Sequence, residues 1–226
     1  MGTSKGYISP STPNWASAKR GISGYISNPS ETKKKQSIAD YSKAMTADTS
    51  LYQKAATIFA DFGNFVSYSN HHGIERALSE YGKDYIKELS TEEAFFSLVN
   101  SFSEGNTIDD VIANGCISEA LIVLEINSFD DFSKIDNKAL IKELVCQFAK
   151  QKFAQMFDKH IKNKCKNINV AQSYLKDLQE YIYYTVKSQL TDSVLSEINP
   201  KSIASVEIVT RVINKAFDLL EHYYDE

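Results

Sequence analysis

Proline, glycine, cysteine and tryptophan are scarce in this sequence, and each shortage narrows what the chain can be. The 226 residues contain four prolines, nine glycines, three cysteines and one tryptophan. Proline and glycine interrupt regular structure, so their scarcity beyond the first thirty residues predicts a body of long regular elements. The cysteines, Cys116, Cys146 and Cys165, are odd in number and form no CxxC pair. Neither a disulfide framework nor a zinc site is therefore indicated.

Long hydrophobic runs are also missing. No apolar stretch approaches the roughly 20 residues that cross a bilayer, and the N-terminus lacks the apolar core of a secretory signal peptide. The start nearly matches a myristoylation signal, but Gly6 stands where serine or threonine is required. These absences, together with cysteines that suit a reducing compartment, favour a cytoplasmic protein with no membrane partner.

Positive charge is too scarce for a general nucleic-acid binder, because the net charge is -4. The charge is unevenly distributed, however. Residues 1–45 contain seven Lys or Arg and two Asp or Glu, whereas the remaining 181 residues contain 18 and 27. This distribution predicts three parts: a flexible tail (1–13), a basic helical arm (14–45) and an acidic helical domain (46–226).

Apolar residues recur at helical spacing along most of the chain. Residues 50–70 carry Leu51, Ala55, Ile58, Phe59 and Phe62 close to the i, i+3, i+4, i+7 pattern. A helix is expected over about 15–25, with Asn14 as its N-cap, and another is expected to follow the capping box at 90–93. The pair Asn199-Pro200 predicts the start of the last helix, which runs to the end of the chain. The other helices are expected over 31–45, 74–81, 107–124 and 136–164, and from 169 onward. Gly21 and Gly24 weaken the helix over 15–25 by about 1 kcal/mol each. With no alternating strand pattern, the sequence predicts an all-α multi-helix bundle with a flexible N-terminal tail.

Motifs that carry chemistry are absent. There is no GxSxG elbow, no Cys–His signature, no GxxxxGK[ST] and no GxGxxG. His71 and His72 are adjacent, so on a helix they point about 100° apart and cannot easily share a metal. His160 and His222 have no carboxylate at a known ligand spacing, which favours surface or helix-terminal imidazoles. We therefore expect a protein that is not an enzyme and that holds no metal or resident cofactor.

Two charged clusters have structural alternatives. A basic cluster with Phe153 and Phe157 between its members could contact nucleic acid; it comprises Lys150, Lys152, Lys159, Lys162, Lys164 and Lys166. Yet the phenylalanines lie on the apolar stripe and the lysines approach a helix C-terminus, where cations are stabilised. A solvated helix end is the favoured interpretation. The pairs Asp109-Asp110 and Asp130-Asp131 are likewise favoured as helix N-terminal charges rather than metal ligands.

The chain opens with MGTSKGYISPSTPNW. Its first 13 residues, which we call the leader, have the properties of a peptide substrate. Removal of Met1 would expose the amine of Gly2, whose pKa of about 7.7–8.0 leaves far more neutral nucleophile at pH 7 than a lysine with a pKa of about 10.4. Glycine lacks a Cβ and so enters a narrow pocket, while Pro10 and Pro13 limit the entropy lost on binding. An ordinary disordered start is the alternative.

The leader also resembles a known family. Met-Gly-Thr-Ser, the aromatic Tyr7, Ser9-Pro10 and Pro13-Asn14-Trp15 are similar to the opening of QatB proteins from the bacterial Qat anti-phage defence system. A looser resemblance continues through 109–124, the segment FAKQKFAQMFDKHI and the ending VTRVINKAFDLLEHYYDE. The chain departs from the family in having Ser9-Pro10 where Gly-Pro is usual, and a shorter spacer before Trp15.

The resemblance implies a non-enzymatic component encoded beside an ATPase, a QueC-like enzyme and a TatD-like nuclease. It further implies that the QueC-like partner attaches a deazaguanine-type base to the amine of Gly2. The residues expected to be modified or recognised are Gly2, Thr3, Ser4, Tyr7, Pro10, Pro13 and Trp15. Two alternatives stay open: a helical adaptor that acts through its body alone, and a weak nucleic-acid-binding module that uses the lysines of 150–166.

Overall fold

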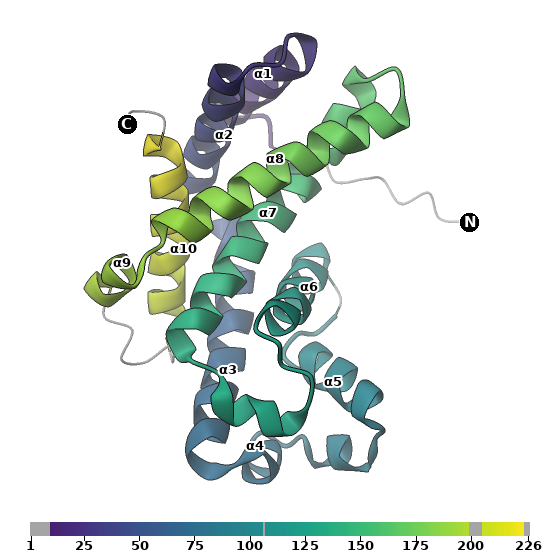
Figure 1. Cartoon of the computed structure of the whole chain (residues 1–226), viewed down its shortest axis with the longest axis vertical. Helices are drawn as coiled ribbons and strands as arrows, with labels where there is room; N and C mark the ends of the chain where they lie inside the picture. The colour runs from purple at the N-terminus through teal and green to yellow at the C-terminus, as the bar shows by residue number, and fades with distance from the viewer. Residues whose placement is uncertain (1–9, 106, 199–204, 224–226) are drawn as a thin grey trace. The chain divides into compact units, whose positions relative to one another are not determined.

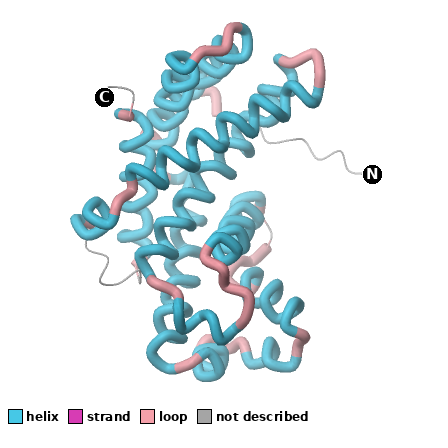
Figure 2. Tube along the Cα trace, viewed as in Figure 1, coloured by secondary structure: helices cyan, strands magenta, loops and turns pink. Residues whose placement is uncertain are grey.

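Helices make up nearly all of the regular structure in the computed structural model, which describes residues 10–105, 107–198 and 205–223. Loops are short, and the described residues contain no β-strand (Figures 1 and 2). The prediction of an all-α fold is confirmed. The elements in order are α1 (Pro13–Ser27), α2 (Glu31–Thr46), α3 (Ser50–His72), α4 (Ile74–Glu80), η1 (Asp84–Glu88), α5 (Thr91–Asn100), α6 (Ile108–Val123), η2 (Phe129–Lys134), α7 (Asn137–Lys164), α8 (Ile168–Gln189), α9 (Asp192–Glu197) and α10 (Val206–His222).

The chain divides into two compact units. The first contains the described residues of 1–49, 149–190 and 214–226, and the second those of 50–148 and 191–213. Helices α7 and α10 contribute residues to both units because their bounds cross these divisions. The grouping differs from the expected separation of 14–45 from 46–226, since the basic arm packs with later parts of the chain.

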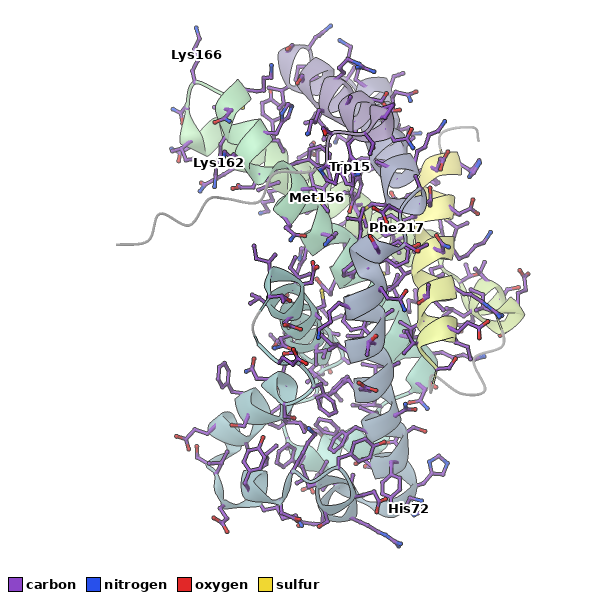
Figure 3. The ribbon with its side chains drawn as sticks, turned by 180° about the vertical axis from the view of Figure 1, so that it is seen from behind. Trp15, His72, Met156, Lys162, Lys166 and Phe217 are labelled. Atoms are coloured by element: carbon purple, nitrogen blue, oxygen red, sulfur yellow. The ribbon has the colours of Figure 1, made fainter. Side chains whose placement is uncertain are left out.

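An aromatic cluster joins the three stretches of the first unit. The ring of Trp15 lies 5.8 Å from that of Phe157, and the ring of Tyr41 lies 5.7 Å from that of Phe217 in an edge-to-face arrangement. All four side chains are buried, and Figure 3 shows Trp15, Met156 and Phe217 among the packed helices. Aromatic pairs in this geometry stabilise a core beyond their buried area by about 0.5–1.5 kcal/mol each.

A polar joint ties α1 and α2, which lie side by side in Figure 1, to α8. The hydroxyl of Tyr25 donates to the Asp177 carboxylate at 2.5 Å, and the Lys34 ammonium donates to its other oxygen at 2.8 Å. Burial, followed by the bond to Asp177, raises the pKa of Tyr25 well above its ordinary value. The phenol therefore stays a proton donor throughout the physiological range.

The second unit is built around α3, which contacts α4, α6 and η2. Phe65 packs edge-on against Phe102 and Phe132, with ring centroids 5.4 Å and 6.1 Å away. Gly73 ends α3: its φ of +85° suits glycine, and its N–H donates to the Ser69 carbonyl at 2.8 Å. Gly73 is therefore the C-terminal cap of α3.

The capping box predicted at 90–93 and the helix start predicted at 107 are confirmed. Thr107 accepts the N–H of Asp110 at 3.1 Å, and the Asp110 carboxylate accepts the N–H of Thr107 at 3.0 Å. Glu93 accepts the N–H of Ser90 at 3.3 Å. The carboxylate of Asp131 accepts the N–H of Ser128 at 2.9 Å. Asp110 and Asp131 are therefore helix-capping groups. The sequence likewise favours a role at helix N-termini over a role as metal ligands.

Other helix boundaries differ from the expectation. Helix α1 begins at Pro13 with Thr12 as its N-cap, and not after Asn14 as expected. Proline is well suited to the first helical position, because a backbone N–H at that position would have no partner within the helix. Helix α8 begins at Ile168 with Asn167 as its cap. The start predicted at Asn199-Pro200 lies outside the described residues, and α10 is described from Val206. Helix α9 and the two 3-10 helices were not predicted.

Candidate recognition site at the base of the leader

The described part of the leader is its base, residues 10–13. The expected modification or recognition residues Gly2, Thr3, Ser4 and Tyr7 lie outside the described residues. Pro10 and Pro13 are described and belong to the first unit, as does Trp15. The structure therefore places the attachment point of the leader.

Hydrogen bonds hold this attachment point. The Lys19 ammonium donates to the Pro10 carbonyl at 3.2 Å. The Thr12 carbonyl accepts the N–H of Ala16 at 2.9 Å, which closes the first turn of α1. Pro13 is exposed at the first helical position. Its ring fixes φ, and it has no N–H that would require a hydrogen-bond acceptor. The path of the chain into α1 is therefore defined from Pro10 onward.

Trp15, one of the expected recognition residues, is buried. Its side chain is 1% exposed and packs against Tyr41 and Phe157. Because so little of the ring is exposed, its evident role in the structure is that of an anchor in the core. Its partners come from α2 and α7, which means that the leader base is fastened to two other helices of the same unit.

An open recess of about 390 Å³ lies beside the leader base. The start of α1 and the end of α2 line it, through Thr12, Pro13, Asn14, Trp15, Ala44, Ala47 and Asp48. None of these seven residues is a histidine, cysteine or lysine. The recess therefore offers shape, a hydroxyl and a carboxylate to a bound partner, but no acid–base pair for chemistry.

His160 is a joint between helices rather than the surface or helix-terminal imidazole expected. Its Nε2 lies 2.9 Å from the Ser23 hydroxyl and 3.2 Å from the Lys19 carbonyl, so α7 is held to α1. Burial is the main cause that lowers the pKa of His160 below its ordinary value. The Ser23 hydroxyl donates to the Lys19 carbonyl at 2.9 Å. Because the Ser23 hydroxyl proton is donated to this carbonyl, it is not donated to the imidazole. Ser23 and His160 therefore have the geometry of a structural clamp between helices and not that of an activated nucleophile with its base.

The six-lysine cluster is only partly a surface. Lys152 is 1% exposed and belongs to the core, and Lys150 lies half-buried with its ammonium 5.7 Å from the Tyr183 ring. The four exposed members are Lys159, Lys162, Lys164 and Lys166. Figure 3 shows Lys162, in the last turn of α7, and Lys166, in the turn between α7 and α8. Asp158 pairs with the Lys162 ammonium at 2.7 Å, which reduces the charge offered to a phosphate.

The remaining histidines do not assemble a metal site. His71 places Nδ1 2.7 Å from the Ser67 carbonyl, and the ring of His72 packs 4.4 Å from that of Tyr68. Within residues 10–105, 107–198 and 205–223 no three His, Cys, Asp or Glu side chains are grouped to hold a metal ion. Likewise, no helix in these ranges combines the length and apolar character needed to cross a membrane.

Comparisons with known proteins bear on the body of the chain. The model of a family described as "Qat anti-phage system associated protein QatB" matches residues 45–220. The uncharacterized protein MJ1566 of Methanocaldococcus jannaschii is 28% identical over 96 residues, which cover 42% of this chain and 20% of that protein. The chain thus matches about a fifth of that relative's length. No solved structure matches the chain. The family match begins after the leader.

Proposed function

The chain belongs to the QatB family of proteins associated with the Qat anti-phage system, and we propose that it acts there without being an enzyme itself. In this proposal it presents its leader to a QueC-like partner enzyme, which recognises or covalently modifies Gly2. The other proteins of the defence system are its further partners. The proposal includes a cytoplasmic location, in keeping with three cysteines that form no disulfide.

The fixed base of the leader is the observation that supports this function. Trp15 is locked in the aromatic core and α1 begins at Pro13. Gly2 is eight residues before Pro10, and a chain spans at most about 3.3–3.6 Å per residue, so the amine lies within roughly 30 Å of the Pro10 position in any conformation. A partner that modifies Gly2 must therefore bind within that radius, where the recess at Thr12 and Ala47 is available to it.

The proposed chemistry divides between the two proteins. This chain supplies an α-amine that is partly neutral at pH 7 and carries no Cβ to obstruct a narrow active site. The partner supplies a deazaguanine-type base whose reactive carbon carries a leaving group. The amine attacks that carbon, the C–N bond forms as the leaving group departs with its bonding electrons, and the nitrogen then gives up a proton. The body of the chain, which lacks a catalytic constellation in its described residues, serves as the scaffold.

Intact-mass spectrometry tests this function. We expect the chain, when produced together with its genomic neighbours, to carry an added mass of a purine-like base that peptide mapping places on Gly2. The variant Gly2→Pro converts the primary amine into a ring nitrogen and should lose both the added mass and protection against phage. Ser11→Ala, an exposed change within the leader base that leaves Gly2 intact, is the matched control and should retain both. Recovery of only the unmodified chain, or of the chain lacking Met1 alone, would contradict the proposal.

An adaptor that acts through its body alone is the second candidate, because the family match covers 45–220 and not the leader. Deletion of residues 2–9 separates the two. The first proposal expects protection to be lost in a plaque assay, whereas the adaptor expects it to persist. Circular dichroism should show that the shortened chain keeps a helical spectrum, since the deletion removes no residue of α1 to α10.

A further inference from the structure

Helix α6 has an apolar stripe that nothing in the described chain covers. Ile108, Val111 and Ile122 are 51%, 64% and 69% exposed. Steps of three and eleven residues bring helical positions back to nearly the same side, so the three side chains share one face of α6. Gly115 and Ser118 lie between them on that face, so its centre carries only small side chains.

The opposite face of α6 is already used inside the second unit. Ile112, Ala113, Cys116, Ile117 and Ala120 are buried there, and the helix packs against α3 and α5 (Figure 1). Helix α6 is therefore apolar on two sides. A helix that is apolar on two sides is expected to be covered on both of them. A single exposed aliphatic residue is normal on a protein surface, whereas a stripe of three is typical of a contact surface.

The segment of chain that carries the stripe is strongly acidic. From residue 88 to residue 133 the sequence contains no Lys, Arg or His and ten acidic residues: Glu88, Glu92, Glu93, Glu104, Asp109, Asp110, Glu119, Glu125, Asp130 and Asp131. The Lys54 ammonium of α3 approaches Asp110 at 3.6 Å, and Lys134 pairs with Asp131. Glu104, Glu119 and Glu125 are exposed, and Glu119 borders the stripe.

We propose that this face of α6 docks an amphipathic helix of another protein, one whose apolar stripe is flanked by Lys or Arg. The distance from residue 108 to residue 122 corresponds to about 21 Å along the axis, the length of about four helical turns. The small side chains of Gly115 and Ser118 let the partner helix approach closely, the three aliphatic side chains anchor it, and the carboxylates steer and orient its cations. An anionic membrane or a nucleic acid would be repelled by the same charges.

The docking face is independent of the leader, because it belongs to the second unit and the leader to the first. The chain itself contains one basic segment with exposed aliphatic residues, at Lys164, Lys166, Ile168 and Val170. A second copy is therefore the rival occupant. The favoured occupant is a separate protein, since this segment has two exposed aliphatic residues close to a helix start and not a stripe of four turns.

Fluorescence anisotropy with a designed probe tests the proposal. The probe is a labelled 18-residue helix of Leu and Lys with all leucines on one face, and its counterpart carries Glu in place of Lys. We expect the full chain to bind the Lys peptide, to bind it at least tenfold more weakly after V111S together with I122S, and to ignore the Glu peptide. The matched control, I168S together with V170S, removes exposed aliphatic residues of the first unit and should leave the affinity unchanged. Urea unfolding confirms that all variants are folded.

Three results would overturn the inference. The Lys peptide does not bind the wild-type chain, or it binds the stripe variant as tightly as the wild type, in which case charge alone attracts it. Alternatively, sedimentation shows a concentration-dependent dimer that both double variants abolish, which assigns the stripe to a second copy. None of these results changes the mass expected on Gly2, so failure here is distinguishable from failure of the leader proposal.

Discussion

Gly21 of α1 lies so close to Ser37 of α2 that a Cβ atom on Gly21 would come within 3.2 Å of the Ser37 Cα. It would also meet the Asp40 carboxylate at 3.1 Å. The two helices approach each other at this point because no side chain separates them. Gly24, one turn later in α1, has no atom within 4 Å of the equivalent position. Two glycines that look alike in the sequence therefore have opposite significance.

Alanine substitutions at the two glycines should change stability in opposite directions. Gly21→Ala requires Ser37 and Asp40 of α2 to shift by a few tenths of an ångström, and we expect it to lower the free energy of unfolding by about 1–3 kcal/mol, the usual cost of overpacking. Gly24→Ala adds helix propensity in open space and should raise it by about 0.5–1 kcal/mol. Urea unfolding followed by circular dichroism measures both. Stabilisation by Gly21→Ala equal to that by Gly24→Ala would show that the helices do not touch there.

Trp15→Ala should destabilise the first unit by about 3–5 kcal/mol, because it removes a fully buried ring from the contact with Tyr41 and Phe157. Trp15→Phe keeps an aromatic ring and should cost less. The free energy of unfolding in urea gives the comparison, with Ser11→Ala expected to match the wild type. If Trp15→Ala has the same urea midpoint of unfolding as the wild type, the ring is not part of the core.

The clamp at His160 predicts a pH dependence. Burial lowers the pKa of the folded imidazole, whereas the unfolded chain has an ordinary pKa of about 6.5. Below pH 6.5 the unfolded state therefore binds a proton that the folded state does not, and stability falls as the pH decreases toward the lowered pKa. We expect the free energy of unfolding to be smaller at pH 5 than at pH 7.

His160→Gln should make that loss between pH 7 and pH 5 smaller than in the wild type, since the titrating group is gone. Other groups contribute equally to both chains and cancel in the difference. Ser23→Ala, which removes a hydroxyl from the clamp but keeps the imidazole, should lower stability while retaining the pH dependence. Parallel profiles for the wild type and His160→Gln would rule out this source of the acid sensitivity.

Lys54 and Asp110 provide a test in the second unit. The Asp110 side chain is fully buried and the Lys54 ammonium lies 3.6 Å from it. Lys54→Met removes this cation from a buried carboxylate and should lower the free energy of unfolding by about 1–3 kcal/mol. Lys54→Arg keeps the charge and should lose less than half as much. Equal thermal midpoints for the two variants would show that the charge of Lys54 is unimportant to Asp110.

Features set by neighbouring residues were predictable from the sequence, and features set by distant residues were not. The caps at Ser90 and Thr107 depend on residues three positions away, and the pattern of the chain indicates both. The start of α1 at Pro13 was also within reach, since proline favours the first helical position. His160 meets Ser23 across 137 residues, and no local pattern indicates that contact.

The candidate site shows the same division. The composition of the leader was evident, but the burial of Trp15 depends on α2 and α7, which pack around it only in the folded unit. Lys152 lies within a run of lysines that all look exposed, yet tertiary packing places it in the core. The recess beside Thr12 is formed by the end of α2, which the sequence does not bring next to the leader.

The first unit is assembled from three stretches of chain, and this has a consequence for biosynthesis. A ribosome releases α1 and α2 first, but Phe157 and Phe217, which complete their aromatic core, come after the residues of 50–148. At about 5–20 residues per second, those roughly 100 residues take about 5–20 s to emerge. During that interval Trp15 and Tyr41 face water or a chaperone, while much of the second unit has already been delivered. The part of the protein that is translated first is thus among the last to finish folding.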